Sequence, residues 1–454
     1  MGGHLAGIAS KRPSPAAVTR QRLGAWVGGR LYDRRPMQSR LATLLAVVAV
    51  AGCSATPSSP PPTPTAAPTP TSAPTVVAPS PTPADPATVY ALVASQVEAI
   101  RGLQPTKAVA PVLLDQAQLT KNLIADYDKA NPAAAVAISE RELIALGLIP
   151  EGSSMRALVL DLQSGQVAGY YSTEDKQLFV VSRAGGVGPT QRLTYAHEFT
   201  HQLQDQTFDL DSIEVQAPDQ GDRWLAWLAL VEGDAVSVQT TWMVTELTAD
   251  DLGQVTQDAL DPAGLAAFSR APKILQETAF FPYQAGAAFV AGLITNGNYD
   301  AVNAAYADPP PSTEQVIHPE KYVARELPIV VKPASTLASK LGSGWSELAR
   351  DTLGELTLRV WLNTGGVSSA DASTAAAGWG GDRLVLFSGP GGATAIAIET
   401  AWDTAADAAE FEAAATRALA GHGLASLIVH TAGSTRVSIA IGLDITQLAA
   451  ALPG

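Results

Sequence analysis

Apolar residues recur every three or four positions through residues 89–150, which predicts amphipathic helices there. Asn131-Pro132 interrupts this repeat, so at least two helices are expected, because proline favours an end to the preceding helix. The positions that carry the repeat are Val89, Leu92, Val93, Val97, Ile100, Leu119, Leu123, Ile124 and Tyr127.

Shorter apolar runs predict strands further along the chain. Residues 156–162, 166–171 and 177–181 are such runs, separated by turn-forming residues. Beyond residue 331, four more runs surround an Ala-rich helix expected at 404–419; they are Leu384–Phe387, Ala395–Ile398, Leu427–Val429 and Val437–Ile441. The pattern predicts an α+β protein with a helical part at 89–150, a second unit at 151–330 and a small α/β or ferredoxin-like module at 331–454.

Two histidines near the middle of the chain have the spacing of metal ligands. His197 and His201 are four residues apart in an apolar segment, and Glu198 directly follows the first. On a helix, positions i and i+4 share one face, so both rings can point at one ion. This is the H-E-x-x-H pattern of zinc hydrolases, in which the zinc lowers the pKa of its water to about 7 and the Glu accepts the proton of that water. The alternative is a helix that carries two surface histidines.

A third ligand is expected from the next apolar segment. Residues 223–235 lack proline and read as a buried helix, in which Glu232 is an acid that burial would make costly unless it bound a metal or a partner. Gly233 beside it would let this helix approach the zinc helix closely. A third histidine six residues after the second is excluded because position 207 is Thr. The alternative is that Glu232 and Asp234 begin an exposed helix.

These two motifs together resemble those of the gluzincin superfamily of zinc metallopeptidases. The resemblance implies a zincin-like catalytic domain at 151–330, one Zn²⁺ ion on His197, His201 and Glu232, and Glu198 as general base. It also implies a small sheet before the zinc helix, whose edge strand pairs with the backbone of a peptide substrate.

The second motif departs from that of thermolysin, because Val236 stands where thermolysin has its final Asp. The acceptor that orients the first histidine is therefore open, and Asp234 and Asp205 are both candidates. Two further residues are candidates for stabilising an oxyanion: Tyr283, in a probable helix, and His318, before a proline. A structural hydrogen bond is the alternative role for His318.

The N-terminal region resembles a bacterial lipoprotein signal peptide. Residues 37–52 combine a charged start with an apolar core of eleven residues, too short to span a bilayer, and end directly before Cys53. Cys53 is the single cysteine of the chain and fits the lipidated first residue of a mature lipoprotein. A free thiol on a tail is the alternative, and residues 1–36 are expected to be an upstream extension, with Met37 the more natural start.

The segment that follows Cys53 predicts a tether. Residues 53–88 are rich in Pro, Thr, Ser and Ala, a composition that cannot bury a core and stays extended. Residues 1–52 carry eight of the 29 Lys and Arg and one of the 43 Asp and Glu, so the remaining chain has 21 basic and 42 acidic residues, a net charge of −21. Such a charge disfavours nucleic-acid binding. The expected location is extracytoplasmic, held at the membrane by a lipid on Cys53.

Two functions from different classes remain open on the sequence. The first is a membrane-tethered zinc metallopeptidase that acts on a peptide or protein substrate. The second is a non-catalytic surface-binding or structural lipoprotein that keeps the zincin scaffold. The complete H-E-x-x-H favours the enzyme, because a scaffold without catalysis has no use for Glu198.

Overall fold

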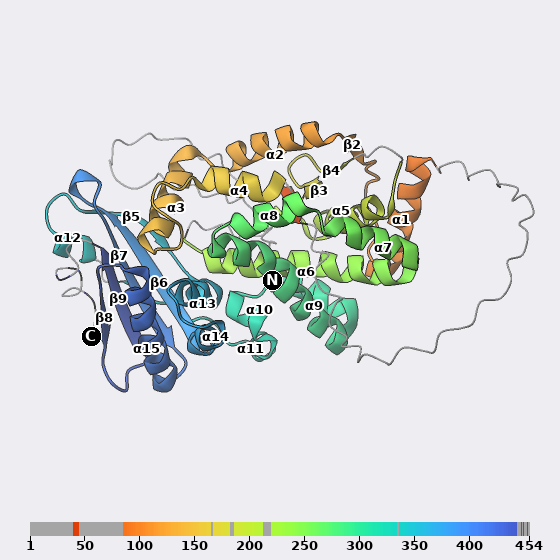
Figure 1. Ribbon diagram of the computed structural model, residues 1–454. Helices are drawn as coiled ribbons and strands as arrows, with labels where there is room; N and C mark the ends of the chain where they lie inside the picture. The colour runs from red at the N-terminus through yellow and green to blue at the C-terminus, as the bar shows by residue number, and fades with distance from the viewer. Residues whose placement is uncertain are drawn as a thin grey trace, which may run out of the picture.

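The computed structural model describes residues 40–44, 85–164, 167–181, 186–211, 219–333 and 336–442, together with residues 446, 448 and 452. Cys53, residues 1–36 and the predicted tether up to residue 84 lie outside the described residues. The described part has a helical body with a small sheet and, at the other end, a second sheet with its own helices (Figure 1). The expected α+β class is confirmed. None of the described helices has the length and apolarity needed to cross a membrane.

The N-terminal helices form where the apolar repeat predicts them. Tyr90, Val93 and Val97 of α1 are buried, and so are Leu119 and Leu123 of α2. Asp85 caps α1, and an Asp115–Gln118 capping box begins α2 by satisfying backbone N–H groups of the first turn. The first four helices are α1 (Pro86–Arg101), α2 (Gln116–Ala130), α3 (Ala133–Ala145) and α4 (Met155–Ser164).

Helix α4 corrects the strand expected at residues 156–162. Its apolar residues Met155, Leu158, Val159 and Leu162 follow the i, i+3, i+4, i+7 spacing of one helical face, and they pack on the main core. The hydroxyl of Ser154 accepts a hydrogen bond from the backbone N–H of Ala157 at 3.3 Å, as a residue before a helix does. Residues 156–162 alone resemble a strand, because the i, i+3, i+4, i+7 series starts at Met155, one residue before this segment.

The other two expected strands of this region are confirmed, as β3 (Val167–Ser172) and β4 (Gln177–Val181). They pair antiparallel, with β2 (Val112–Leu114) parallel to β4 and β1 (Arg40–Leu44) antiparallel to β3, in the order β1-β3-β4-β2. β1 belongs to the predicted signal segment, so the mature chain that the sequence predicts would lack it and β3 would be an edge strand.

Helix α5 covers this sheet, and α5 and α6 together carry the site. Helix α5 contacts β3 and β4 on one side and α6 on the other, and it is buried from Leu193 to Asp205. Helices α1 and α7 also contact α5. The helices that follow β4 in the chain are α5 (Pro189–Phe208), α6 (Gly221–Glu246), α7 (Ala249–Ala259), α8 (Pro262–Arg270), α9 (Lys273–Ala307), α10 (Thr313–Ile317) and α11 (Pro319–Ala324) (Figure 1).

Gly233 permits a close helix approach, but to α9 and not to the zinc helix as expected. A Cβ atom on Gly233 would lie 2.2 Å from the carbonyl oxygen of Gly286, and one on Gly286 would lie 2.1 Å from the carbonyl oxygen of Ala229. Two glycines therefore let the backbones of α6 and α9 touch where Glu232 leaves α6. The expectation was wrong because Glu232 and Gly233, adjacent on a helix, point about 100° apart.

The C-terminal sheet contains the four strands expected there. Its order is β5-β6-β7-β9-β8, with neighbouring strands antiparallel. β7 and β8 run parallel to each other with β9 between them, and α15 (Ala405–His422) connects them, which is a split β-α-β unit of the ferredoxin-like kind. The strands are β5 (Ser346–Asp351), β6 (Trp379–Ser388), β7 (Thr394–Trp402), β8 (Ser426–His430) and β9 (Arg436–Gly442).

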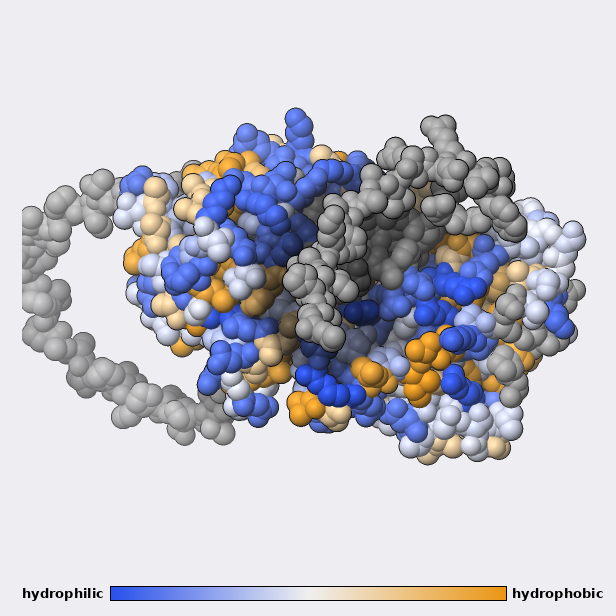
Figure 2. Space-filling model, turned by 180° about the vertical axis from the view of Figure 1, so that it is seen from behind, coloured by the Kyte–Doolittle hydropathy of each residue, from blue (hydrophilic) through white to orange (hydrophobic). Residues whose placement is uncertain are grey.

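The two ends of the molecule share one apolar core. One face of the C-terminal sheet packs against α15, α13 (Gly354–Thr364) and α14 (Ser369–Ala376), in a cluster that continues into α6 and α9. The opposite face packs against α12 (Leu337–Leu341). From the side opposite to Figure 1, the described surface is mostly hydrophilic, with apolar residues in separate groups (Figure 2).

Candidate metal centre

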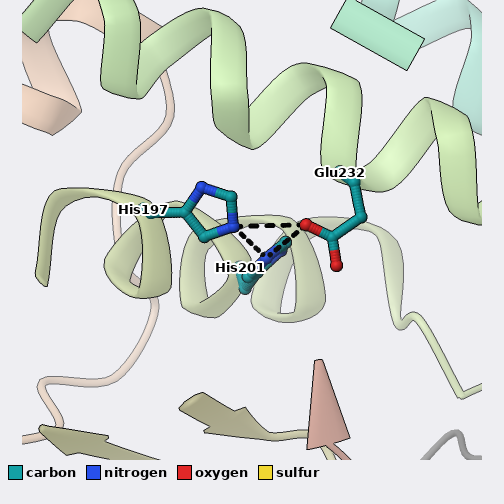
Figure 3. Close-up of side chains that lie close together, drawn as sticks. All are labelled: His197, His201 and Glu232. Carbon is teal, nitrogen blue, oxygen red and sulfur yellow. Dashed lines mark hydrogen bonds and ion pairs between the residues drawn. The ribbon is translucent and has the colours of Figure 1, made fainter. Parts of the chain in front are cut away.

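Three side chains from two helices converge between α5 and α6. His197 and His201 lie one turn apart on the same face of α5, and Glu232 reaches them from α6 (Figure 3). The relative exposure of these residues is 0%, 0% and 2%. The structure therefore brings together the three ligands that the sequence predicts, and they form a group that could hold a metal ion.

The spacing of the three donor atoms fits a zinc ion. Nε2 of His197 and Nε2 of His201 are 3.0 Å apart, and Oε2 of Glu232 lies 3.2 Å and 3.4 Å from them respectively. In a tetrahedron with metal–ligand bonds of about 2.0–2.1 Å, ligand atoms are roughly 3.3 Å apart. The three atoms thus form nearly one face of such a tetrahedron, and its fourth corner is left for another ligand.

The electrostatics of the group favour a cation between these atoms. Burial lowers the pKa of His197, and the hydrogen bond that Glu232 accepts from it offsets this only in part. Burial also lowers the pKa of His201, but the charges of Glu232 and Glu198 outweigh it and raise this pKa to about 9. Burial alone would raise the pKa of Glu232, whereas His201 and His197 lower it to about 2. A carboxylate that stays ionised beside two imidazole lone pairs requires a positive charge, either protons or a metal.

Glu198 lies beside the three residues of the candidate metal centre. It is fully buried on α5, and its charge acts on His201. Its place in the chain, next to His197, puts its carboxyl group on the neighbouring face of the helix. Glu198, the residue predicted to be the general base, is thus buried on the same helix as His197 and His201.

Tyr283 also lies at the centre. It is on α9, and its ring stacks on that of His197 with centroids 6.2 Å apart. The residue is 6% exposed. Of the two candidates for stabilising an oxyanion, Tyr283 is thus the one whose ring stacks on a residue of the candidate metal centre.

His318 takes part in a different cluster, at the junction with the C-terminal sheet. Its Nε2 lies 3.1 Å from Oε1 of Glu355 on α13, and its Nδ1 lies 3.8 Å from Glu320. These contacts agree with the structural role left open for a histidine before a proline. We therefore assign His318 to the packing of α10 and α11 against α13.

The His318–Glu355 contact predicts a pH-dependent stability. The hydrogen bond that His318 donates to Glu355 raises the pKa of His318, with smaller contributions from the charges of Glu320 and Glu314, against the opposing effect of burial. Protonated His318 therefore stabilises the fold below its unfolded pKa of about 6.5, and the contribution is lost as the pH rises through the higher folded pKa. In urea unfolding, we expect His318→Gln to lower the free energy of unfolding by about 1 kcal/mol at pH 6 and by much less at pH 9. An equal loss at both pH values would contradict this assignment.

Neither aspartate that was a candidate for orienting the first histidine contacts it in the structure. Asp205 accepts a hydrogen bond from Tyr171 at 2.8 Å and pairs with Lys176 at 2.9 Å. Asp234 contacts Gln204, which in turn contacts the second histidine. The sequence expectation missed Gln204 because a neutral side chain was not considered as an acceptor, although it follows His201 by three residues on the same helical face.

Two other groups of acids among the described residues consist of carboxylates alone, and each contains acids that pair with a lysine. Lys176 pairs with Asp205 and Asp211, and Lys321 pairs with Glu314, Glu326 and Asp403. Within the part of the chain that the structure describes, the group with histidine ligands is the one that suits a transition metal.

Comparisons with known proteins cover a different part of the chain. A family model described as Domain of unknown function (DUF8575) matches residues 341–444, which include the C-terminal sheet and its helices. No curated protein and no solved structure matches the chain. The match leaves out His197, His201 and Glu232, so the centre is interpreted from its own geometry.

Proposed function

We propose that this protein is a zinc metallopeptidase that is held at the outer face of a bacterial membrane. The observation that carries the proposal is the triangle of His197, His201 and Glu232, whose donor atoms are 3.0–3.4 Å apart in a buried layer beside Glu198. Two imidazoles with one carboxylate are a ligand set of catalytic zinc sites, whereas Mg²⁺ and Ca²⁺ prefer oxygen ligands. When bound, zinc supplies an acidified water and a positive charge for the carbonyl oxygen under attack.

Glu198 is the base in this proposal. Its carboxylate accepts one proton of the water while the oxygen of the water bonds to the carbonyl carbon, and then gives that proton to the amide nitrogen. The C–N bond then breaks, and the products are a carboxylic acid and a neutral amine. The burial of Glu198 excludes bulk water, which strengthens its interactions with the reacting groups.

Tyr283 is the donor to the developing oxyanion in this proposal. Its ring lies against His197, on the side of the centre that α9 forms. For Tyr283→Phe we expect kcat to fall about 100-fold with little change in KM and in zinc content, since only the hydroxyl is removed. Steady-state kinetics with a peptide substrate would check this, and an unchanged kcat would contradict the role.

The small sheet supports a peptide as the substrate in this proposal. β1 pairs with β3 next to the zinc helix, and it lies in the segment that the predicted signal cleavage removes. The mature chain would then present the β3 edge to an extended peptide, whose backbone could pair there while its scissile bond reaches the centre.

The location rests on the N-terminal sequence. The signal segment, Cys53 as lipidation site and the Pro-rich tether together support anchoring to the membrane, with the folded part held away from its surface. The net charge of −21 for the chain from Cys53 on supports a protein partner rather than a nucleic acid.

Cleavage of a peptide library by the chain that starts at Cys53 tests this function. We expect cleavage that stops when a zinc chelator is added and returns when zinc is restored. Cleavage that resists the chelator would contradict a zinc mechanism. No cleavage of any peptide by the zinc-loaded chain would favour the non-catalytic lipoprotein.

A further inference from the structure

Gln204 contacts the ring nitrogen of His201 that does not face the proposed zinc ion. Oε1 of Gln204 lies 2.8 Å from Nδ1 of His201. The amide nitrogen of Gln204 donates to the backbone carbonyl of Val231 and to Oδ2 of Asp234, both at 3.0 Å. The glutamine is fully buried and joins α5 to α6 on either side of Glu232.

These partners determine which way the amide of Gln204 points. A carbonyl oxygen and a carboxylate oxygen can only accept hydrogen bonds, so the NH₂ group must face Val231 and Asp234. The amide oxygen is then left for His201, and its partner there must be an N–H group. Nδ1 of His201 therefore carries a hydrogen, and in the neutral ring Nε2 keeps the lone pair that a metal needs.

Asp234 is itself fixed by a buried arginine. Nε of Arg101 lies 2.8 Å and 3.0 Å from the two carboxylate oxygens of Asp234, and Tyr306 donates to Oδ2 at 3.0 Å. Arg101 is 1% exposed and also donates to Asn303 at 2.8 Å. Its guanidinium lies 4.6 Å from the ring centroid of Tyr299, a cation–π distance.

We propose that Arg101, Asp234 and Gln204 form a buried chain of positioning residues that fixes the ring orientation and tautomer of His201 for zinc binding. This inference rests on the proposed zinc centre and goes beyond it, because none of the three residues binds the metal. Arg101 holds the carboxylate of Asp234, the carboxylate holds the amide of Gln204, and the amide holds the imidazole.

A consequence follows for the N-terminal helix. Arg101 is the last residue of α1, the first described helix, which begins at Pro86 within the last residues of the predicted tether. Helix α1 is therefore part of the metal centre, although it supplies no ligand. A buried arginine is costly unless it is paired, and its pairing with the support of a zinc ligand explains its position.

The first test compares two glutamines on the same helix. Gln204→Leu removes the acceptor of His201, whereas Gln202→Leu is the same substitution at an equally buried position whose side-chain atoms have no hydrogen-bond partner among the described residues. Zinc affinity is measured for the chain from Cys53 on by competition with a chelator. We expect Gln204→Leu to weaken zinc binding about 10–100-fold and Gln202→Leu to leave it unchanged.

The second test acts at the far end of the chain of contacts. Arg101→Lys keeps the charge but loses the planar fork, whereas Arg101→Met loses both. We expect zinc affinity to fall in the order wild type, lysine variant, methionine variant, and the visible spectrum of the Co²⁺-substituted protein to change with it. A purely structural role would lower the thermal midpoint of the zinc-free protein in these variants without altering that spectrum.

The outcomes separate this proposal from the proposed function. If wild type binds zinc and the two leucine variants bind it equally well, the positioning chain is overturned and the zinc centre stands. If Gln204→Leu does not fold, the spectra of the Arg101 variants decide: an unchanged Co²⁺ spectrum overturns the proposal. If wild type takes up no zinc, the proposal and the proposed function fall together.

Discussion

Glu198→Gln abolishes peptide cleavage and leaves zinc bound, if the centre works as proposed. The substitution keeps the size and shape of the side chain but removes its ability to accept a proton. General-base catalysis contributes about 10²–10⁴-fold, so we expect kcat/KM to fall by at least 100-fold. The zinc content should stay near that of wild type, because the ligands are His197, His201 and Glu232. Steady-state kinetics and atomic emission on the same preparation measure both quantities.

A buried glutamate elsewhere provides the control. Glu399→Gln changes an acid on β7 in the C-terminal sheet, which is 7% exposed, and should leave kinetics and zinc content unchanged. A Glu198→Gln variant that retains wild-type activity would contradict the assignment of Glu198. It would leave the metal centre intact but require another base.

Gly286→Ala destabilises the protein by about 3 kcal/mol, since it inserts a methyl group between two helix backbones. The new Cβ would lie 2.1 Å from the carbonyl oxygen and 2.9 Å from the carbonyl carbon of Ala229, so α6 and α9 must separate. Because Glu232 leaves α6 at this crossing and Tyr283 lies on α9, zinc affinity and activity should fall as well. Urea unfolding measures the loss of stability.

The matched control lies on the same helix. A Cβ on Gly292 of α9 would have nothing within 4 Å, so Gly292→Ala should be neutral or stabilise the helix by about 0.5–1 kcal/mol. Equal effects of the two substitutions would show that helix propensity, rather than the close crossing, controls the result.

The three residues of the candidate metal centre could be predicted from the sequence because their pattern is local within each helix. The four-residue spacing of His197 and His201 fixes their common face once α5 forms, and Glu232 stands out as an acid in an apolar run. The strands β3 and β4 could also be predicted from local sequence, since turn-forming residues stand at the ends of each short apolar run.

The features that the sequence did not predict depend on contacts between distant segments. Arg101 and Asp234 are 133 residues apart in the chain, and no local pattern indicates that they pair. The side of α6 that Gly233 faces is set by the crossing with α9, which the sequence does not specify. The strand prediction for residues 156–162 was wrong for a different reason. The apolar residues of this segment suit a strand by composition, and their helical spacing is recognisable only when Met155 is included.

Zinc content tests the central claim most directly. It is measured by atomic emission on the purified chain from Cys53 on, in wild type and in the His197→Ala and Glu232→Ala variants. We predict close to one zinc per chain in wild type and loss of zinc in both variants, because each removes a corner of the ligand triangle. A folded wild-type chain that contains no zinc and takes up none when it is added would contradict the account.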